Sequence, residues 1–151
     1  MLIDTIQQFF VRDLQKLRFE IQSYKNESVI WHAEKGITNP AGNLVLHLVG
    51  NLNAFIGEAL GHTGYIRNRP LEFSLKNVSR EELISKIDQT IKMIEEVMPG
   101  LKELDLDELF PILVFEEKTS NEFFLVHLAV HLNYHLGQVN YHRRLLDKSG
   151  E

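Results

Sequence analysis

Apolar residues recur every three or four positions along the beginning of the chain, which is the spacing of one face of an α-helix. The first such segment covers residues 2–24, with apolar residues at Ile6, Phe9, Phe10, Leu14, Leu17 and Ile21. Residues 26–37 lack this period and are predicted to form a loop. A second segment begins at Asn39-Pro40, because asparagine is a favoured helix cap and proline a favoured first helical residue. Its pattern predicts a second helix to about Gly61.

The third predicted helix follows a connection without clear periodicity. Gly61 and Gly64 end the second helix, and residues 65–77 carry Arg-Asn-Arg-Pro, which is typical of a crossover connection. Ser79-x-x-Glu82 then has the form of a capping box, in which a serine side chain and a glutamate three residues later satisfy free backbone N–H groups. The pattern predicts a helix to about residue 98, where Pro99-Gly100 closes it.

The last part of the chain holds the longest periodic segment. Residues 101–118 are ambiguous, because their first leucines could extend a helix while Phe110-Pro-Ile-Leu-Val-Phe115 looks extended. We therefore expect a packed, mostly non-helical connection there. Thr119-x-x-Glu122 is a second capping-box pattern, and it predicts a fourth helix to about residue 147.

Four long helices and a long crossover predict an all-α fold, a four-helix bundle. The 151 residues suit one domain covering residues 1–151, since a chain of this length buries roughly two-thirds of its unfolded surface. No stretch of 18 uninterrupted apolar residues is present, so no membrane span is expected. The N-terminus lacks the basic and apolar regions of a signal peptide, which favours a cytoplasmic location.

Charge and cysteine content narrow the possible chemistry. The formal net charge is −5, and the basic pairs Arg67/Arg69 and Arg143/Arg144 are short, so we expect no nucleic-acid partner and interpret these pairs as ordinary solvated charge. The chain has no cysteine, which removes disulfides and thiolate ligands. Any bound metal would therefore be held by imidazole and oxygen donors.

Histidines supply the most specific chemical pattern. His127, His131 and His135 follow one another at intervals of four, so they lie along one stripe of the fourth helix. Two neighbours of such a stripe can share one ion, but all three cannot, because about 12 Å of helix separates the outer two. His47 lies between apolar positions of the second helix and is the best third donor.

Competing interpretations stay open at this point. The histidines could be hydrogen-bonded groups along a polar seam of the bundle, with about the same odds as a metal site. His32, His62 and His142 are weaker ligand candidates because they lie in a loop, at a helix end and near the chain terminus. The amides of Asn43, Asn51 and Gln138 could orient imidazoles or simply face a loop. Glu58 and Tyr134 could each be considered as a general base, but both are more easily explained as structural residues.

Two stretches resemble a known family. His131-x-x-x-His135-Leu-Gly-Gln138 resembles the His-x-x-x-His-x-Gly-Gln signature of the DinB-like (YfiT-like) metalloprotein superfamily, and Asn43-Leu-Val-Leu-His47-Leu resembles its second-helix motif. The segment from Gly64 to Phe73 further resembles an uncharacterised bacterial branch. The resemblance implies an up-down-down-up bundle, a divalent metal held by His47, His131 and His135, and a homodimer. His127 lies one turn before the motif and is expected to neighbour the ligands, and Asn51 and Gln138 are the amides expected from their spacing to support them.

The resemblance leaves several functions open. Some members of that superfamily are S-transferases that use a low-molecular-weight thiol, so we expect a metal-dependent transferase or hydrolase acting on a small electrophile. Three histidines suit nickel, zinc, iron or manganese, and they leave coordination positions open. The alternative is a metal-free dimeric stress-response or interaction module without catalysis. Fold and metal together do not name a substrate.

Overall fold

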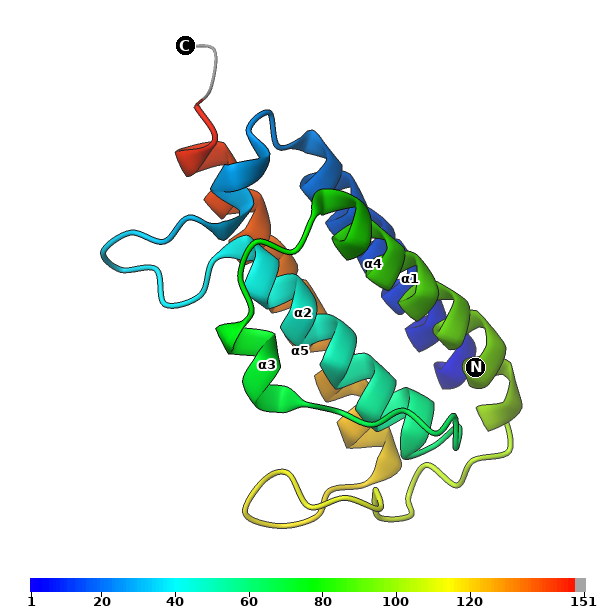
Figure 1. The fold of residues 1–151 in the computed structure, drawn as a ribbon. Coiled ribbons are helices and arrows are strands. Elements are labelled where there is room, and N and C mark those ends of the chain that lie inside the picture. Colours follow the sequence, from blue (N-terminus) through cyan, green and yellow to red (C-terminus); the bar gives the residue numbers. More distant parts are fainter. Residues whose placement is uncertain (149–151) are drawn as a thin grey trace.

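The first helix carries one face of the core. The computed structural model describes residues 1–148, and α1 spans Leu2–Ser23 (Figure 1). The positions predicted to be apolar and inward are buried, with the exception of Phe9, which is 42% exposed. A short 3₁₀ helix, Glu27–Trp31, follows within the stretch predicted as a loop. The period of three and four residues thus gave the first helix correctly.

Helix α2 spans Ala41–Leu52 and continues directly into a π-helical segment, Asn53–Glu58. Its N-cap is Pro40, and no side chain caps the helix, so the prediction that Asn39 is the cap was wrong. Eleven of the 12 residues of α2 are buried, because other elements cover it on all sides. Single π turns are frequent next to functional sites, and this one follows the part of α2 that carries His47.

The crossover holds a helix that periodicity did not reveal. Helix α3, Arg69–Ser74, begins after Asn68, whose side chain accepts a hydrogen bond from the Leu71 backbone at 3.3 Å. Helix α4 spans Arg80–Val97, and the Ser79 hydroxyl accepts from the Glu82 backbone as the capping-box pattern predicted. A turn of 3₁₀ helix, Met98–Leu101, closes α4.

The connection between α4 and α5 is mostly non-helical, as predicted. Its two arms are joined at the base by backbone hydrogen bonds, including Phe110 N–H to the Thr119 carbonyl at 2.8 Å. Helix α5 spans Asn121–Leu146, and its cap is Ser120, which accepts from the Phe123 backbone. The predicted cap at Thr119 was therefore wrong by one residue.

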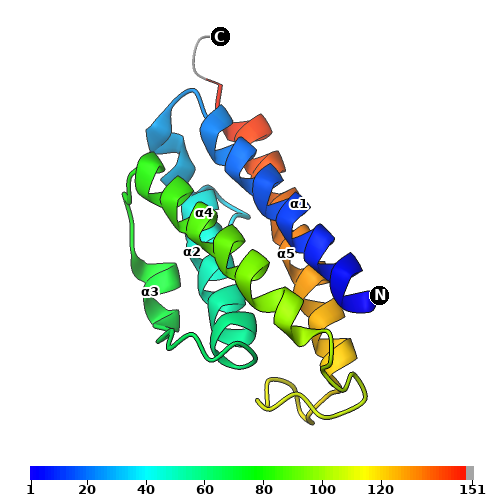
Figure 2. The same cartoon turned by 90° about the vertical axis from the view of Figure 1, so that its right-hand side faces the viewer.

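The four long helices pack lengthwise around a common core. Helix α1 contacts α4 and α5, and α2 contacts the same two helices from the other side. In Figure 1, α1 and α5 run toward the end that holds the C-terminus, while α2 and α4 run away from it. Figure 2 shows α3 on the outer side of α2, with the connection before α5 at the opposite end from the C-terminus. The fold of the described residues is all-α.

Buried polar pairs fix the position of α5 against α1. Asn133 donates to the Asp13 carboxylate at 2.9 Å. About two turns further along α5, Asn140 and Arg143 both donate to Glu20. Glu20 is 7% exposed, so sliding α5 along α1 would leave this buried carboxylate without its partners, and Asp13, which is 2% exposed, would keep only Arg12. The register of α5 in turn places its histidines opposite α2.

None of the helices in residues 1–148 has both the length and the apolar composition needed to cross a membrane.

Candidate metal centre

Three of the seven histidines come together between α2 and α5. One nitrogen from each of His47, His131 and His135 lies within 4.8 Å of the other two. The closest pair is His47 Nε2 and His131 Nε2, which are 3.2 Å apart. Two nitrogens on a tetrahedral zinc ion with bonds of about 2.1 Å are about 3.4 Å apart, so this spacing is close to that of a ligand pair. The cluster could hold a metal ion.

The electrostatics of the cluster favour neutral imidazole, the form that binds metals. Burial, together with the neighbouring His135 and His47 rings, lowers the pKa of His131 to about 3. Burial also lowers the pKa of His135. Near neutral pH these rings therefore keep a lone pair on one nitrogen.

A carboxylate selects which nitrogen of His47 is free. Glu72, on α3, lies 3.0 Å from His47 Nδ1, and both side chains are buried. A carboxylate can only accept, so Nδ1 carries the proton and donates it, which leaves the lone pair on Nε2, facing His131. Many metal-ligating histidines are oriented by a carboxylate in this way.

Glu72 is itself held in its ionised form. Arg67 donates two hydrogen bonds to it, from Nε at 2.8 Å and from a terminal nitrogen at 2.9 Å. Burial would raise the pKa of Glu72, but the hydrogen bonds from His47 and Arg67 outweigh it, and the pKa lies below its usual value. The guanidinium also lies 5.5 Å from the ring centre of Phe55, which restricts its movement.

A glycine makes room for this carboxylate. A Cβ at Gly50 of α2 would lie 2.6 Å from the Glu72 carboxyl carbon and closer still to one of its oxygens. Gly50 lies one helical turn after His47, on the side that faces α3. Only glycine therefore allows Glu72 to approach α2 closely enough to reach the imidazole.

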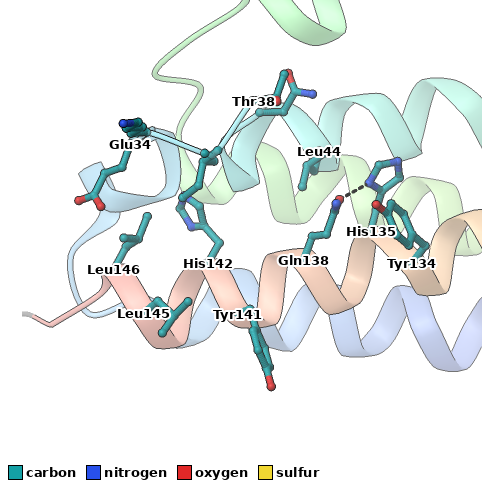
Figure 3. Close-up of a pocket in the computed structure, with 14 residues that line it drawn as sticks. Glu34, Thr38, Leu44, Tyr134, His135, Gln138, Tyr141, His142, Leu145 and Leu146 are labelled. Atoms are coloured by element: carbon teal, nitrogen blue, oxygen red, sulfur yellow. Dashed lines mark hydrogen bonds between the residues drawn. The ribbon is translucent and has the colours of Figure 1, made fainter.

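A side-chain amide orients the imidazole of His135 in the same way. The side-chain oxygen of Gln138 lies 2.6 Å from His135 Nδ1, as the dashed line in Figure 3 marks. With Nδ1 donating to this oxygen, the Nε2 lone pair of His135 is free. Two of the three histidines are thus oriented so that their Nε2 atoms are available.

His131 and Asn51 each keep one buried polar atom without a partner. Neither His131 Nδ1 nor Asn51 Oδ1 has a hydrogen bond within the described part of the chain. When Nε2 of an imidazole binds a metal, Nδ1 carries a proton and needs an acceptor, and an amide oxygen is one. Both residues line the same cavity. The donor set and its surroundings therefore fit a divalent ion.

Two cavities flank the histidine cluster. One, of about 440 Å³, is lined by His47, His131, Arg67, Arg69 and the apolar residues 112–114. The other, of about 720 Å³, lies between α5 and the loop of residues 34–39 and borders His135, with His142 deeper along the same wall (Figure 3). Small molecules can therefore approach the cluster from two directions.

The remaining histidines lie outside the cluster. The His127 ring packs against that of Phe115, with 4.9 Å between their centres, and lies 6.0 Å from the His131 ring. His127 also lines the smaller cavity. His142 bonds to the Tyr24 hydroxyl and the His32 carbonyl, while His32 and His62 are exposed.

Glu58 and Tyr134, which the sequence favoured as structural residues over a general base, lie in other surroundings. Glu58 accepts a hydrogen bond from the Gly64 backbone at 2.5 Å. Tyr134 is 62% exposed, and its ring is 5.3 Å from that of His135. Neither residue makes a hydrogen bond to the histidine cluster within residues 1–148.

Sequence reasoning missed the partners of His47. Glu72 and Arg67 lie in the stretch interpreted as a crossover, and Arg67 was interpreted as solvated charge, yet its side chain is only 17% exposed. Asn68-Arg69-Pro70 is the same cap-and-proline signal that was used for the second helix, and it marks the start of α3. That signal could have indicated a helix, but it does not show which neighbour Glu72 would meet.

The chain belongs to an uncharacterised family. The model of the family described as "Protein of unknown function (DUF1572)" matches residues 3–150. No curated protein matches the chain, and no solved structure matches it either. The family match names neither an activity nor the DinB-like superfamily.

Proposed function

We propose that His47, His131 and His135 hold one divalent metal ion and that the protein is a metal-dependent enzyme. The observation that carries this proposal is that three imidazole nitrogens lie within 4.8 Å of one another. Two of these rings are also oriented through Nδ1 by Glu72 and Gln138. A polar seam without a metal would not need partners that leave the Nε2 lone pairs of two of its imidazoles free. Nickel, zinc, iron and manganese all suit three histidines.

The reaction class follows from the open positions and the cavities. A divalent ion with three protein ligands lowers the pKa of a bound water or thiol and so supplies a nucleophile at neutral pH. Glu72 and Gln138 keep the protons on the outer nitrogens of His47 and His135, while His131 Nδ1 has no acceptor within the described residues. Two cavities suit a reaction of two small molecules, such as transfer of a low-molecular-weight thiol to an electrophile. Hydrolysis is the related possibility.

We further propose that the fold is the DinB-like four-helix bundle, with up-down-down-up topology and a single domain over residues 1–151. The directions of α1, α2, α4 and α5 and the long connection from α2 to α4 support it (Figure 1). A cytoplasmic location and small-molecule rather than nucleic-acid partners remain predictions, the second supported by the net charge of −5.

Elemental analysis of tag-free protein tests the metal site. We expect close to one metal per chain in the wild type and a loss of metal in the His47→Ala/His131→Ala/His135→Ala variant. His32→Gln is the matched control, because its side chain is exposed and lies outside the cluster. Thiol-transfer and hydrolysis assays on the loaded protein would follow. Absence of metal from the wild type, even after reconstitution with each of the four ions, would contradict the proposal.

The second candidate is a dimeric interaction module without metal. One observation favours it: α5 exposes an apolar stripe in which every side chain is at least 40% exposed, made of Phe123, Val126, Val130, Tyr134, Tyr141 and Leu145. The stripe suits a homodimer interface in either candidate. The module alone predicts a melting temperature that neither chelator nor added metal changes, whereas a site specific to the native state predicts stabilisation by metal. Light scattering of Val130→Glu would test the interface.

A further inference from the structure

The smaller cavity beside the histidine cluster combines an apolar wall with positive charge. In a chain with a net charge of −5, the residues that line it include Arg67 and Arg69 and no carboxylate. Arg67 is neutralised by Glu72. Arg69 makes no ion pair within the described residues, and its guanidinium lies over the Phe73 ring at 5.2 Å. Since the Phe73 ring is 5.0 Å from that of His47, this free cation lies near the cluster.

Residues 112–114, within the apolar run from Phe110 to Phe115, also line this cavity. Phe110 is fully buried and stacks on Phe124 at 3.9 Å, and so anchors the beginning of the run. Ile112, Leu113 and Val114 are instead 41%, 59% and 43% exposed, and all three line the cavity. Burying such side chains is favourable, so leaving three together in water indicates that something apolar covers them.

We propose that this cavity binds an amphipathic anion, with its negative group on Arg69 and its apolar part against Ile112–Val114. The volume of about 440 Å³ lies within the range of small-molecule sites. His47 and His131 line the same cavity, so the bound molecule would meet the histidine cluster. The inference rests on the proposed function insofar as it names the substrate class of that site, but the binding step itself needs no metal.

The test uses octanoate as the probe and octanamide as its neutral counterpart. Titration of the full-length, metal-free protein by calorimetry and by amide NMR should show octanoate binding, with shifted resonances at residues 112–114. Arg69→Gln should weaken octanoate binding about tenfold and leave octanamide binding unchanged, because only the anion uses the charge. Arg18→Gln removes an arginine on α1, paired with Asp88, and should change neither.

A second arm tests the apolar wall. Octanoate should bind more tightly than butanoate to the wild type, and Leu113→Ser should reduce that difference. Equal affinities in Arg69→Gln and Arg18→Gln would overturn the inference, as would shifts confined to the larger cavity. Concentration-dependent shifts at residues 112–114 without any probe would also overturn it, since a second copy of the chain would then cover the wall.

Metal titration of the same samples separates this inference from the proposed function. Arg69→Gln should bind metal as the wild type does, because Arg69 contacts no predicted ligand. If the wild type takes up no metal but binds octanoate through Arg69, the proposed function fails and the anion site stands. If metal binds and octanoate does not, the anion site fails alone.

Discussion

Replacing Glu72 by glutamine tests whether the carboxylate tunes the histidine cluster or merely fills space. The change keeps the shape of the side chain and one oxygen that can accept from His47 Nδ1. It removes the negative charge that makes the imidazole more basic, and it leaves Arg67, whose side chain is 17% exposed, without its carboxylate. Metal binding should therefore weaken, while the helices should stay formed.

The expected size of the effect follows from the contacts of Glu72. One hydrogen bond to His47 at 3.0 Å acts on the metal ligand directly, and two from Arg67 hold the carboxylate in place. Changes to such supporting groups typically reduce metal affinity about 10–100-fold, which is about 1.4–2.7 kcal/mol. Competition with a chromophoric chelator measures this loss, and Glu96→Gln, an exposed change on α4, is the control.

Gly50→Ala tests the same contact without changing any charge. The added methyl group would meet the Glu72 carboxyl group and push it away from His47. Affinity should fall in the same direction, and the double variant with Glu72→Gln should lose less than the sum of the two losses, because both act on one contact. Metal affinity within twofold of the wild type in both single variants would refute the reasoning, even if their melting temperatures fell.

Three further outcomes are expected. Gln138→Leu removes the acceptor of His135 Nδ1 and should weaken metal binding about tenfold in the chelator assay; an unchanged affinity would show that Gln138 does not orient the imidazole. Phe110→Ala should cost about 3–5 kcal/mol in urea unfolding, because the ring is fully buried; a loss under 1 kcal/mol would show that the connection before α5 is not anchored there. Burial lowers the pKa of His142, so the unfolded state takes up its proton first, and the metal-free protein should lose stability as the pH falls below about 6.5. His142→Gln should flatten that dependence, and an unchanged slope in urea unfolding at pH 5 and pH 7 would contradict it.

The long helices could be predicted because their determinants are local. Spacing of apolar residues and the Ser79 cap need only neighbours in the sequence, and both agree with the structure. The caps predicted at Asn39 and Thr119 were each misplaced by one residue. Ser120 competes with Thr119 because both residues can cap a helix, whereas α2 begins after Pro40 without any side-chain cap. Helix α3 was missed because six residues are too few to show a period.

For the candidate site, the spacing of four placed His127, His131 and His135 on one helical face, and the resemblance of residues 131–138 to a metalloprotein signature singled out His131 and His135. The sequence also indicated His47, whose neighbours on α2 are apolar. That these rings meet depends on where α5 lies against α2, and the polar pairs that hold α5 in register join it to α1, far away in the chain. The partner of His47 is 25 residues away on a different helix, and the contact requires Gly50 to have no side chain. Such a contact is a property of packing between elements, so only the tertiary structure could decide it.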